Sequence, residues 1–126
     1  DDCVEQAVAQ GYVTTILGRR RWIDQVNSSN PNQRALGERL AINSVVQGSA
    51  ADLIKVAMVN LHRTLAEQAV PAKMLLQIHD ELVVECPAVQ TDAVRRAMSD
   101  TMEPAMSLSC PLRVDAGGGP DWFEAK

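Results

Sequence analysis

The spacing of apolar residues predicts an ordered series of helices and short strands. Apolar positions recur at helical spacing in residues 1 to 9, and Gly11 is a plausible end for this helix. Residues 12 to 17 are rich in β-branched side chains and predict a strand. Residues 20 to 26 would return as its hairpin partner after a turn at Gly18-Arg19, and residues 27 to 32 are a loop by composition.

A long helix is predicted from about Gln33 to Gln68, because this stretch lacks proline and its apolar residues recur mostly every three or four positions. The predicted core-facing stripe comprises Leu36, Leu40, Val46, Ala50, Leu53, Ile54, Ala57, Met58, Leu61 and Leu65. The pair Gly48-Ser49 interrupts it. A glycine inside a helix costs roughly 1 kcal/mol relative to alanine, so the missing side chain must serve close packing or a bend.

The remaining sequence predicts a second hairpin and a shorter helix. Two strand-like runs, residues 74 to 79 and 82 to 86, enclose Asp80-Glu81 as their turn. Residues 89 to 102 predict an amphipathic helix, residues 112 to 116 a last strand, and residues 117 to 120 a loop before the tail. This order predicts an α+β fold, in which an antiparallel sheet of hairpins packs on a long helix and a second, shorter helix.

Composition narrows the class of protein. The chain has 126 residues, 46% of them apolar, which favours an ordered core. Its net charge of −4 excludes an overall basic surface, although residues 11 to 63 hold seven Lys or Arg against three Asp or Glu. Three widely separated cysteines fit neither a zinc site nor a disulfide framework. No membrane-spanning run or signal peptide is expected, and because the chain begins without Met we interpret it as a fragment or excised domain.

The segment from Gln77 to Glu85 carries the most unusual chemistry. His79, Asp80 and Glu81 place three consecutive ionisable side chains between two apolar strands. Two-residue turns favour Asn-Gly, Asp-Gly or Gly-X, and adjacent carboxylates repel each other, so Asp-Glu is a costly choice. Magnesium prefers carboxylate oxygens, which makes this turn a candidate cation site. On these residues alone, an ordinary solvent-exposed acidic turn is the more common explanation.

A second candidate site lies on the long helix. Arg39, Asn43 and Gln47 are spaced at i, i+4 and i+8, which aligns them in one polar ridge. Asn and Gln can donate to the minor-groove acceptors that A·T and T·A pairs share, and Arg can contact phosphate. This chemistry suits a protein that holds any DNA sequence, but the spacing alone favours a solvent-exposed helix face.

Four segments resemble one known family. Gln77 to Glu85 resembles the third sequence motif of family A DNA polymerases, the bacterial DNA polymerase I-like enzymes. Residues 38 to 55 resemble the long helix of their palm subdomain, and residues 11 to 21 the hairpin before that helix. The segment Gly119-Pro120-Asp121-Trp122 resembles a Gly-x-x-Trp near the family's C-terminus. The resemblance covers essentially the entire chain in the same order.

The resemblance implies roles for the hairpin residues. Asp80 would be one of two aspartates that hold two catalytic Mg²⁺ ions, and Glu81 would lie beside the metals as the less critical of the pair. Both are therefore candidate catalytic and metal-binding residues. His79 would lie close to the primer terminus. Gly48 and Ala50 would be close-packing positions against this hairpin.

The resemblance also implies the DNA contacts. Arg39, Asn43 and Gln47 would touch the minor groove of the primer–template duplex. The run Arg19-Arg20-Arg21 would meet template or primer phosphates, although a charge run by itself is more often a solvent-exposed face. The expected partners are primer–template DNA, dNTP and the rest of a polymerase chain, with no membrane. The expected location is the bacterial cytoplasm, in association with the nucleoid.

Two parts of the family's active site have no counterpart here. The first metal-binding Asp belongs to an earlier palm motif, and the incoming nucleotide is held by a fingers helix with a Lys, a Phe or Tyr, and a Tyr-Gly pair. The only Tyr and Phe, Tyr12 and Phe123, are misplaced for either motif. We therefore expect residues 1–126 to be the C-terminal palm part of a polymerase domain, without fingers, thumb or exonuclease, and inactive when isolated. A non-catalytic DNA-binding module and a purely structural domain are the competing hypotheses.

Overall fold

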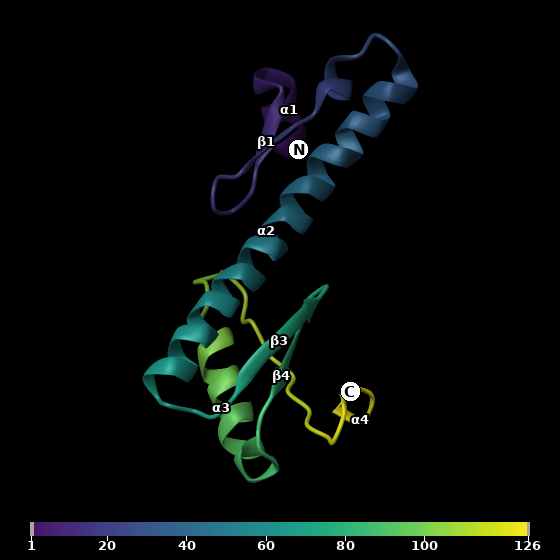
Figure 1. Ribbon diagram of the computed structural model, residues 1–126. Helices are drawn as coiled ribbons and strands as arrows, with labels where there is room; N and C mark the ends of the chain where they lie inside the picture. The colour runs from purple at the N-terminus through teal and green to yellow at the C-terminus, as the bar shows by residue number, and fades with distance from the viewer. Residues whose placement is uncertain (1, 126) are drawn as a thin grey trace. The chain divides into compact units, whose positions relative to one another are not determined.

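The computed structural model describes residues 2–125, and the chain divides into two compact units with a boundary between Asp52 and Leu53. The boundary falls inside the helix α2 (Pro31–Glu67), which therefore contributes to both units. Figure 1 shows the order of the elements along the chain. Each unit has its own hydrophobic core, and each is described separately below.

The first unit combines a helix, a hairpin and the first part of α2. Helix α1 (Asp2–Gln10) is followed by Gly11, which has a φ of 80°. The Gly11 amide donates a hydrogen bond to the Ala7 carbonyl (2.8 Å), and Gly11 thus forms the predicted cap of the helix. Strands β1 (Tyr12–Thr14) and β2 (Arg20–Trp22) pair antiparallel, and a 3₁₀ turn, η1 (Asp24–Asn27), follows. Residues 24 to 26, which the sequence predicted to extend the strand, therefore leave it so that Ile23 and Val26 can enter the core.

A face of small side chains on α2 closes the core of the first unit. Gly37, Ala41, Ser44 and Gly48 follow one another at steps of four, three and four residues, and Ala41 and Ser44 are buried. The core itself consists of Ala7, Val13, Ile23, Val26 and Ala41. Three residues that were predicted to face the core are instead exposed: Leu36 (37%), Val46 (65%) and Ala50, which is therefore not a close-packing position either.

Close packing explains the presence of Gly48 within the continuous helix α2. A Cβ atom at Gly48 would lie 2.5 Å from the Thr15 methyl carbon, so the expected close contact exists. Its neighbour, however, is Thr15 in the β1–β2 turn, whereas the sequence suggested the hairpin of Asp80. The absent side chain thus lets the turn of the first hairpin approach the helix backbone.

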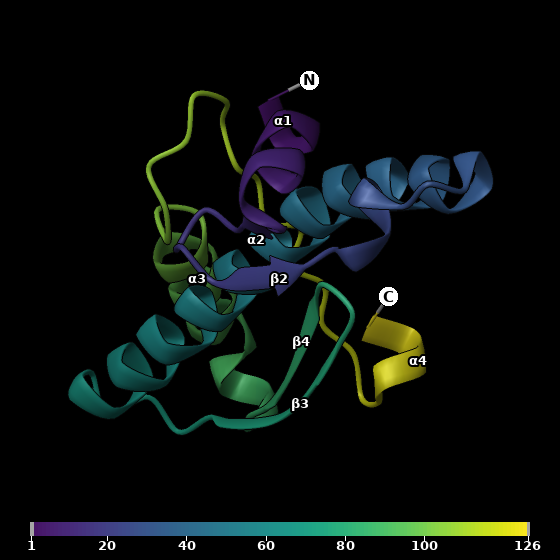
Figure 2. The same ribbon diagram turned by 90° about the horizontal axis from the view of Figure 1, so that it is seen from above.

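The second unit packs a hairpin and α3 on the last part of α2. Strands β3 (Lys73–Ile78) and β4 (Glu81–Glu85) pair antiparallel and are followed by η2 (Ala88–Gln90) and α3 (Thr91–Met102). Its core consists of Ala57, Leu61, Leu65, Ala97 and Met102, with Met74, Leu82 and Val84 of the hairpin packed against it. In both views the hairpin lies between α3 and the short C-terminal helix α4 (Trp122–Ala125) (Figures 1 and 2).

A Schellman motif ends α2. Ala69 has a φ of 49°, its amide donates to the Ala66 carbonyl (3.3 Å), and the Val70 amide donates to the Leu65 carbonyl (3.0 Å). Val70 then packs against the second core, which accompanies this motif in many helices. The chain therefore reverses sharply after α2 and enters β3.

The α+β class predicted from the sequence is confirmed, but the strands differ from the prediction in further respects. Residues 15 to 17, predicted as the end of the first strand, lie outside β1. Within residues 2–125 the hairpins form two separate two-stranded sheets rather than one. Residues 112 to 116, predicted as a strand, are irregular, and the Val114 amide donates instead to the Glu103 carboxylate (3.1 Å). No helix in the described part of the chain has the length and apolar content needed to cross a bilayer.

Gly37 provides a test of the small face. A Cβ atom there would lie 2.5 Å from the Val26 backbone nitrogen, which cannot rotate away. We predict that Gly37→Ala lowers the free energy of unfolding by about 1–3 kcal/mol, despite the higher helix propensity of alanine. Denaturant unfolding measures this change, and Glu38→Ala at the neighbouring exposed position is the control. A Gly37→Ala chain as stable as the control would contradict the packing.

Candidate active site and nucleic-acid interface

The turn between β3 and β4 consists of His79 and Asp80. Ile78 pairs with Glu81, so Glu81 is the first residue of β4 and not part of the turn. The sequence had placed Asp80-Glu81 there, one residue further along. The turn forms the tip of the hairpin and points away from α3 (Figure 1).

His79 has a backbone conformation that side-chain-bearing residues avoid. Its φ is 54°, whereas Asp80 is not among the residues of positive φ. Positive φ at the first of two turn residues is the pattern of a type II′ turn, which normally has Gly there. The left-handed conformation costs a non-glycine residue roughly 1–2 kcal/mol. The Gln77 side-chain amide donates to the His79 carbonyl (2.6 Å) and so braces the turn. Backbone strain of this kind concentrates at functional sites.

The side chains of His79, Asp80 and Glu81 are all exposed. Adjacent carboxylates at Asp80 and Glu81 are donors that suit Mg²⁺, which usually takes one or two protein carboxylates and completes its shell with water and substrate phosphate. No group of three or more His, Cys, Asp or Glu within residues 2–125 is arranged to hold a metal ion. The donor pair therefore fits part of a magnesium site whose other ligands would come from beyond these residues.

The predicted ridge on α2 is accessible. Arg39, Asn43 and Gln47 are all exposed. Arg39 and Asn43 lie two positions after Gly37 and Ala41 of the buried face. Two positions correspond to a rotation of about 200° around the helix, at about 100° per residue. The ridge therefore lies opposite the core of the first unit, as a contact surface requires. Whether it contacts DNA remains a prediction.

The three arginines of the run have different surroundings. The Arg20 guanidinium lies 4.8 Å from the centre of the Tyr12 ring, and Tyr12 in turn meets Trp22 edge-on, with ring centres 5.0 Å apart. Arg21 pairs with Val13 across the hairpin, and its side chain lies on the face of the strand opposite to that of Arg20. Arg19 forms an ion pair with Asp52 of α2.

Asp52 is a residue that the sequence reasoning overlooked. It is 1% exposed, and its carboxylate accepts hydrogen bonds from the Leu17 amide (3.2 Å) and the Arg19 side chain. The hydrogen bond from Thr15, followed by those from Arg19 and Leu17, lowers the pKa of Asp52 below its ordinary value, although burial acts in the opposite direction. An acid within the otherwise apolar run Ala50 to Ile54 was the available signal.

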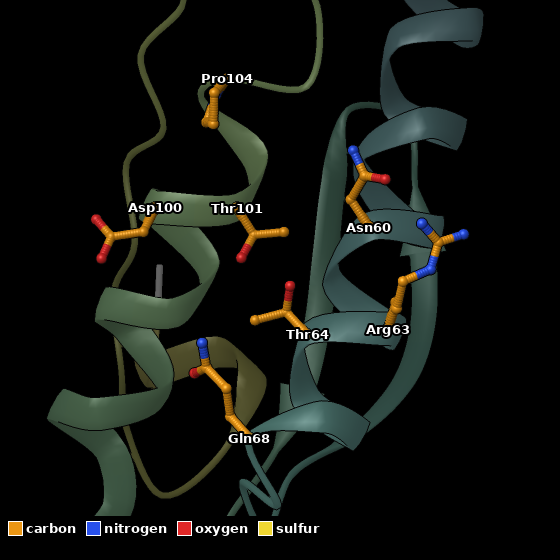
Figure 3. Close-up of a pocket in the computed structure, with 7 residues that line it drawn as sticks. All are labelled: Asn60, Arg63, Thr64, Gln68, Asp100, Thr101 and Pro104. Atoms are coloured by element: carbon orange, nitrogen blue, oxygen red, sulfur yellow. The ribbon is translucent and has the colours of Figure 1, made fainter.

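None of the predicted site residues lines the hollow of about 400 Å³ in the second unit. It is lined by Asn60, Arg63, Thr64, Gln68, Asp100, Thr101 and Pro104. Figure 3 shows Thr64 and Thr101 pointing toward one another, whereas Asp100 points away from the space between the helices. The hollow is open, and its lining has no strained or buried ionisable group, so the hairpin turn remains the candidate for chemistry.

The fold matches one part of a polymerase domain. It matches the POL domain of Pol1 from M. smegmatis, solved in complex with DNA primer-template and dNTP, with a TM-score of 0.92 and 40% sequence identity. The match covers 98% of this chain and 22% of that one. More particularly, the chain belongs to DNA polymerase family A, whose family model matches residues 1–124. This confirms the resemblance seen in the sequence.

Bacterial DNA polymerases I are close relatives. The chain is 44% identical over 126 residues to DNA polymerase I of Bacillus subtilis (strain 168) and 45% identical to that of Geobacillus stearothermophilus. In both cases the alignment covers all of this chain but only 14% of the relative. The chain therefore corresponds to part of a DNA polymerase I polymerase domain.

The strained turn makes a prediction about stability. Because only glycine adopts positive φ without cost, we predict that the His79→Gly chain is more stable than the His79→Val chain by about 1–2 kcal/mol. Denaturant unfolding of the two variants measures the difference. The same pair of substitutions at Glu85, an exposed strand residue, should reverse the order because valine favours strands. Equal stabilities at position 79 would argue against the left-handed conformation.

The lowered pKa of Asp52 predicts a pH dependence of stability. An aspartate whose pKa is lower in the folded chain contributes its full stabilisation above the unfolded value of about 3.9 and loses it as the pH falls through the folded value. The stability gap between the unmodified chain and Asp52→Asn should therefore be widest near neutral pH and narrow below about pH 4. Denaturant midpoints between neutral pH and pH 3 measure it. The matched control is Asp100→Asn, at an exposed position.

Proposed function

We propose that this chain forms part of the active site and of the DNA-binding surface of a template-directed DNA polymerase, with Asp80 as a ligand of Mg²⁺. The observation that supports this most directly is the strained turn that exposes Asp80 at the tip of a hairpin, within a chain that belongs to family A. The M. smegmatis relative binds primer-template and dNTP, and we extend these partners to this chain.

Asp80 and Glu81 are the residues that would hold the metal in this proposal. The bound ions would help the primer 3′-hydroxyl to attack and would stabilise the departing pyrophosphate. Asp80 offers its exposed carboxylate from a turn whose backbone Gln77 braces at the His79 carbonyl. Glu81 is the first residue of β4 and would contribute less to metal binding than Asp80. His79 would lie against the primer terminus.

The DNA contacts in this proposal come from the first unit. Asn43 and Gln47 would donate to minor-groove acceptors that do not distinguish A·T from T·A pairs, so the enzyme accepts any sequence. Arg39 would add a contact to phosphate or to the groove. Arg19, Arg20 and Arg21, all exposed, would contact phosphates of the primer or template. Catalysis and DNA binding would thus depend on different segments of one chain.

Asp80 gives the decisive experiment. Residues 1–126 would replace the matching segment of B. subtilis DNA polymerase I, and primer extension would be measured with Mg²⁺ and dNTPs. We predict that Asp80→Asn lowers the extension rate on the order of a thousandfold, because several kcal/mol of metal-dependent stabilisation is lost. Affinity for primer–template should stay within a few-fold. The matched control is Glu85→Gln, which removes an exposed carboxylate at the far end of β4.

Two further outcomes decide between the hypotheses. The isolated 126-residue chain should show no extension, because it offers only one of the two metal-binding aspartates. If Asp80→Asn leaves extension in the chimeric enzyme unchanged, the metal role is wrong. If, in addition, Gln47→Ala weakens duplex binding, the chain is a DNA-binding module without catalytic residues.

A further inference from the structure

One short stretch of α2 accepts hydrogen bonds from nearly every residue of the β1–β2 turn. The Ser49 hydroxyl accepts from the Ile16 amide (3.0 Å), and the Asp52 carboxylate accepts from the Leu17 amide (3.2 Å). The Gly48 carbonyl accepts from Nη2 of Arg19 (3.2 Å), whose Nε donates to Asp52. We call the Gly48 carbonyl, the Ser49 hydroxyl and the Asp52 carboxylate the acceptor set. Gly48 and Ser49 precede Asp52 by four and three residues, so both lie on the same side of the helix as Asp52.

The turn itself is built to present these donors. The Thr15 amide donates to the Arg19 carbonyl and the Gly18 amide to the Thr15 carbonyl (both 2.9 Å), and Gly18 has a φ of 81°. This is a three-residue hairpin loop with glycine in its left-handed position. The Ile16 and Leu17 amides have no partner within such a loop, and the acceptor set supplies one to each.

Asp52 and Arg19 differ in exposure, and the difference shows which residue depends on the other. The Asp52 side chain is 2% exposed, whereas the Arg19 side chain is 51% exposed. A buried carboxylate without a cationic partner is strongly unfavourable, so Asp52 requires Arg19. The ion pair in turn neutralises the charge of Arg19, so the pair presents almost no net charge to a phosphate.

Arg20 and Arg21 remain available. Neither forms an ion pair among the described residues, and both side chains are exposed. Arg20 lies over the Tyr12 ring, which orders its guanidinium without neutralising it. Because adjacent strand residues point to opposite faces, the two cations reach different sides of the hairpin.

We infer that Asp52 is a positioning residue, which fixes the Thr15–Arg19 turn on α2 and neutralises Arg19, so that Arg20 and Arg21 alone supply the phosphate contacts of the arginine run. This inference rests on the proposed DNA contact of the first unit. It refines that contact by removing Arg19 from it. It also gives a physical role to Gly48, whose missing side chain lets Thr15 reach the helix.

The salt dependence of DNA binding tests the inference, because each phosphate contact contributes about 0.9 to the slope of log K against log salt concentration. Affinity of the 126-residue chain for a primer–template duplex would be measured between roughly 50 and 200 mM salt. Arg21→Gln should reduce the slope by about 0.9. The double variant Arg19→Gln, Asp52→Asn removes one charge of each sign and keeps a hydrogen-bonding pair, so the slope should not change. An equal fall in the slope for this double variant would overturn the inference.

Amide exchange gives a second readout that does not depend on DNA. Asp52→Asn alone should accelerate exchange at the Leu17 amide, and Ser49→Ala should do so at the Ile16 amide, while the Ile23 amide, bonded to the Gly11 carbonyl, stays protected as an internal control. Unchanged exchange at Leu17 in Asp52→Asn would contradict the positioning role. If the two variants change amide exchange as predicted but the unmodified chain fails to bind duplex, the proposed DNA contact fails and the structural part of the inference stands.

Discussion

The structure depends on how closely other segments can approach α2. Along its first part, backbone atoms of Gln25 and Val26 lie where a side chain at Gly37 would be, and the Thr15 methyl group lies over Gly48. Along its last part, Leu61 and Leu65 fill a core together with side chains of α3 and the β3–β4 hairpin. One helix thus uses two packing modes: backbone contact through small residues, and interdigitated side chains through large ones.

These two modes explain how much of the fold the sequence could predict. The large apolar residues of the last part follow helical spacing, so periodicity located Ala57, Leu61 and Leu65 correctly. In the first part the same rule selected Leu36 and Val46, which are exposed, because it gives weight to large side chains. The buried face there is made of glycine, alanine and serine, whose small size lets other segments approach the helix backbone closely. Such a face becomes recognisable only when the three-dimensional structure shows which segment packs against it.

The hairpin of Asp80 shows the same limit at the scale of one residue. Apolar runs predicted two strands joined by an acidic turn at Asp80-Glu81. Pairing decides the register, however, and the pairing of Ile78 with Glu81 moves the turn to His79 and Asp80. An irregularity between Met74 and Leu76 shifts the same strand again. The consequence is chemical: Asp80 is held by turn geometry, whereas Glu81 is held by the pleat of β4.

Charge must also be judged locally rather than along the chain. The excess of Lys and Arg over residues 11 to 63 does not coincide with a structural unit: residues 1–52 hold five Lys or Arg and six Asp or Glu, a net −1, and residues 53–126 a net −3. Neither unit is basic as a whole. Screening limits electrostatic attraction to about 10 Å at moderate salt, which is roughly two turns of helix. What a phosphate meets is therefore set by which cations are already neutralised, and at the β1–β2 turn the buried carboxylate of Asp52 neutralises Arg19 and leaves Arg20 and Arg21.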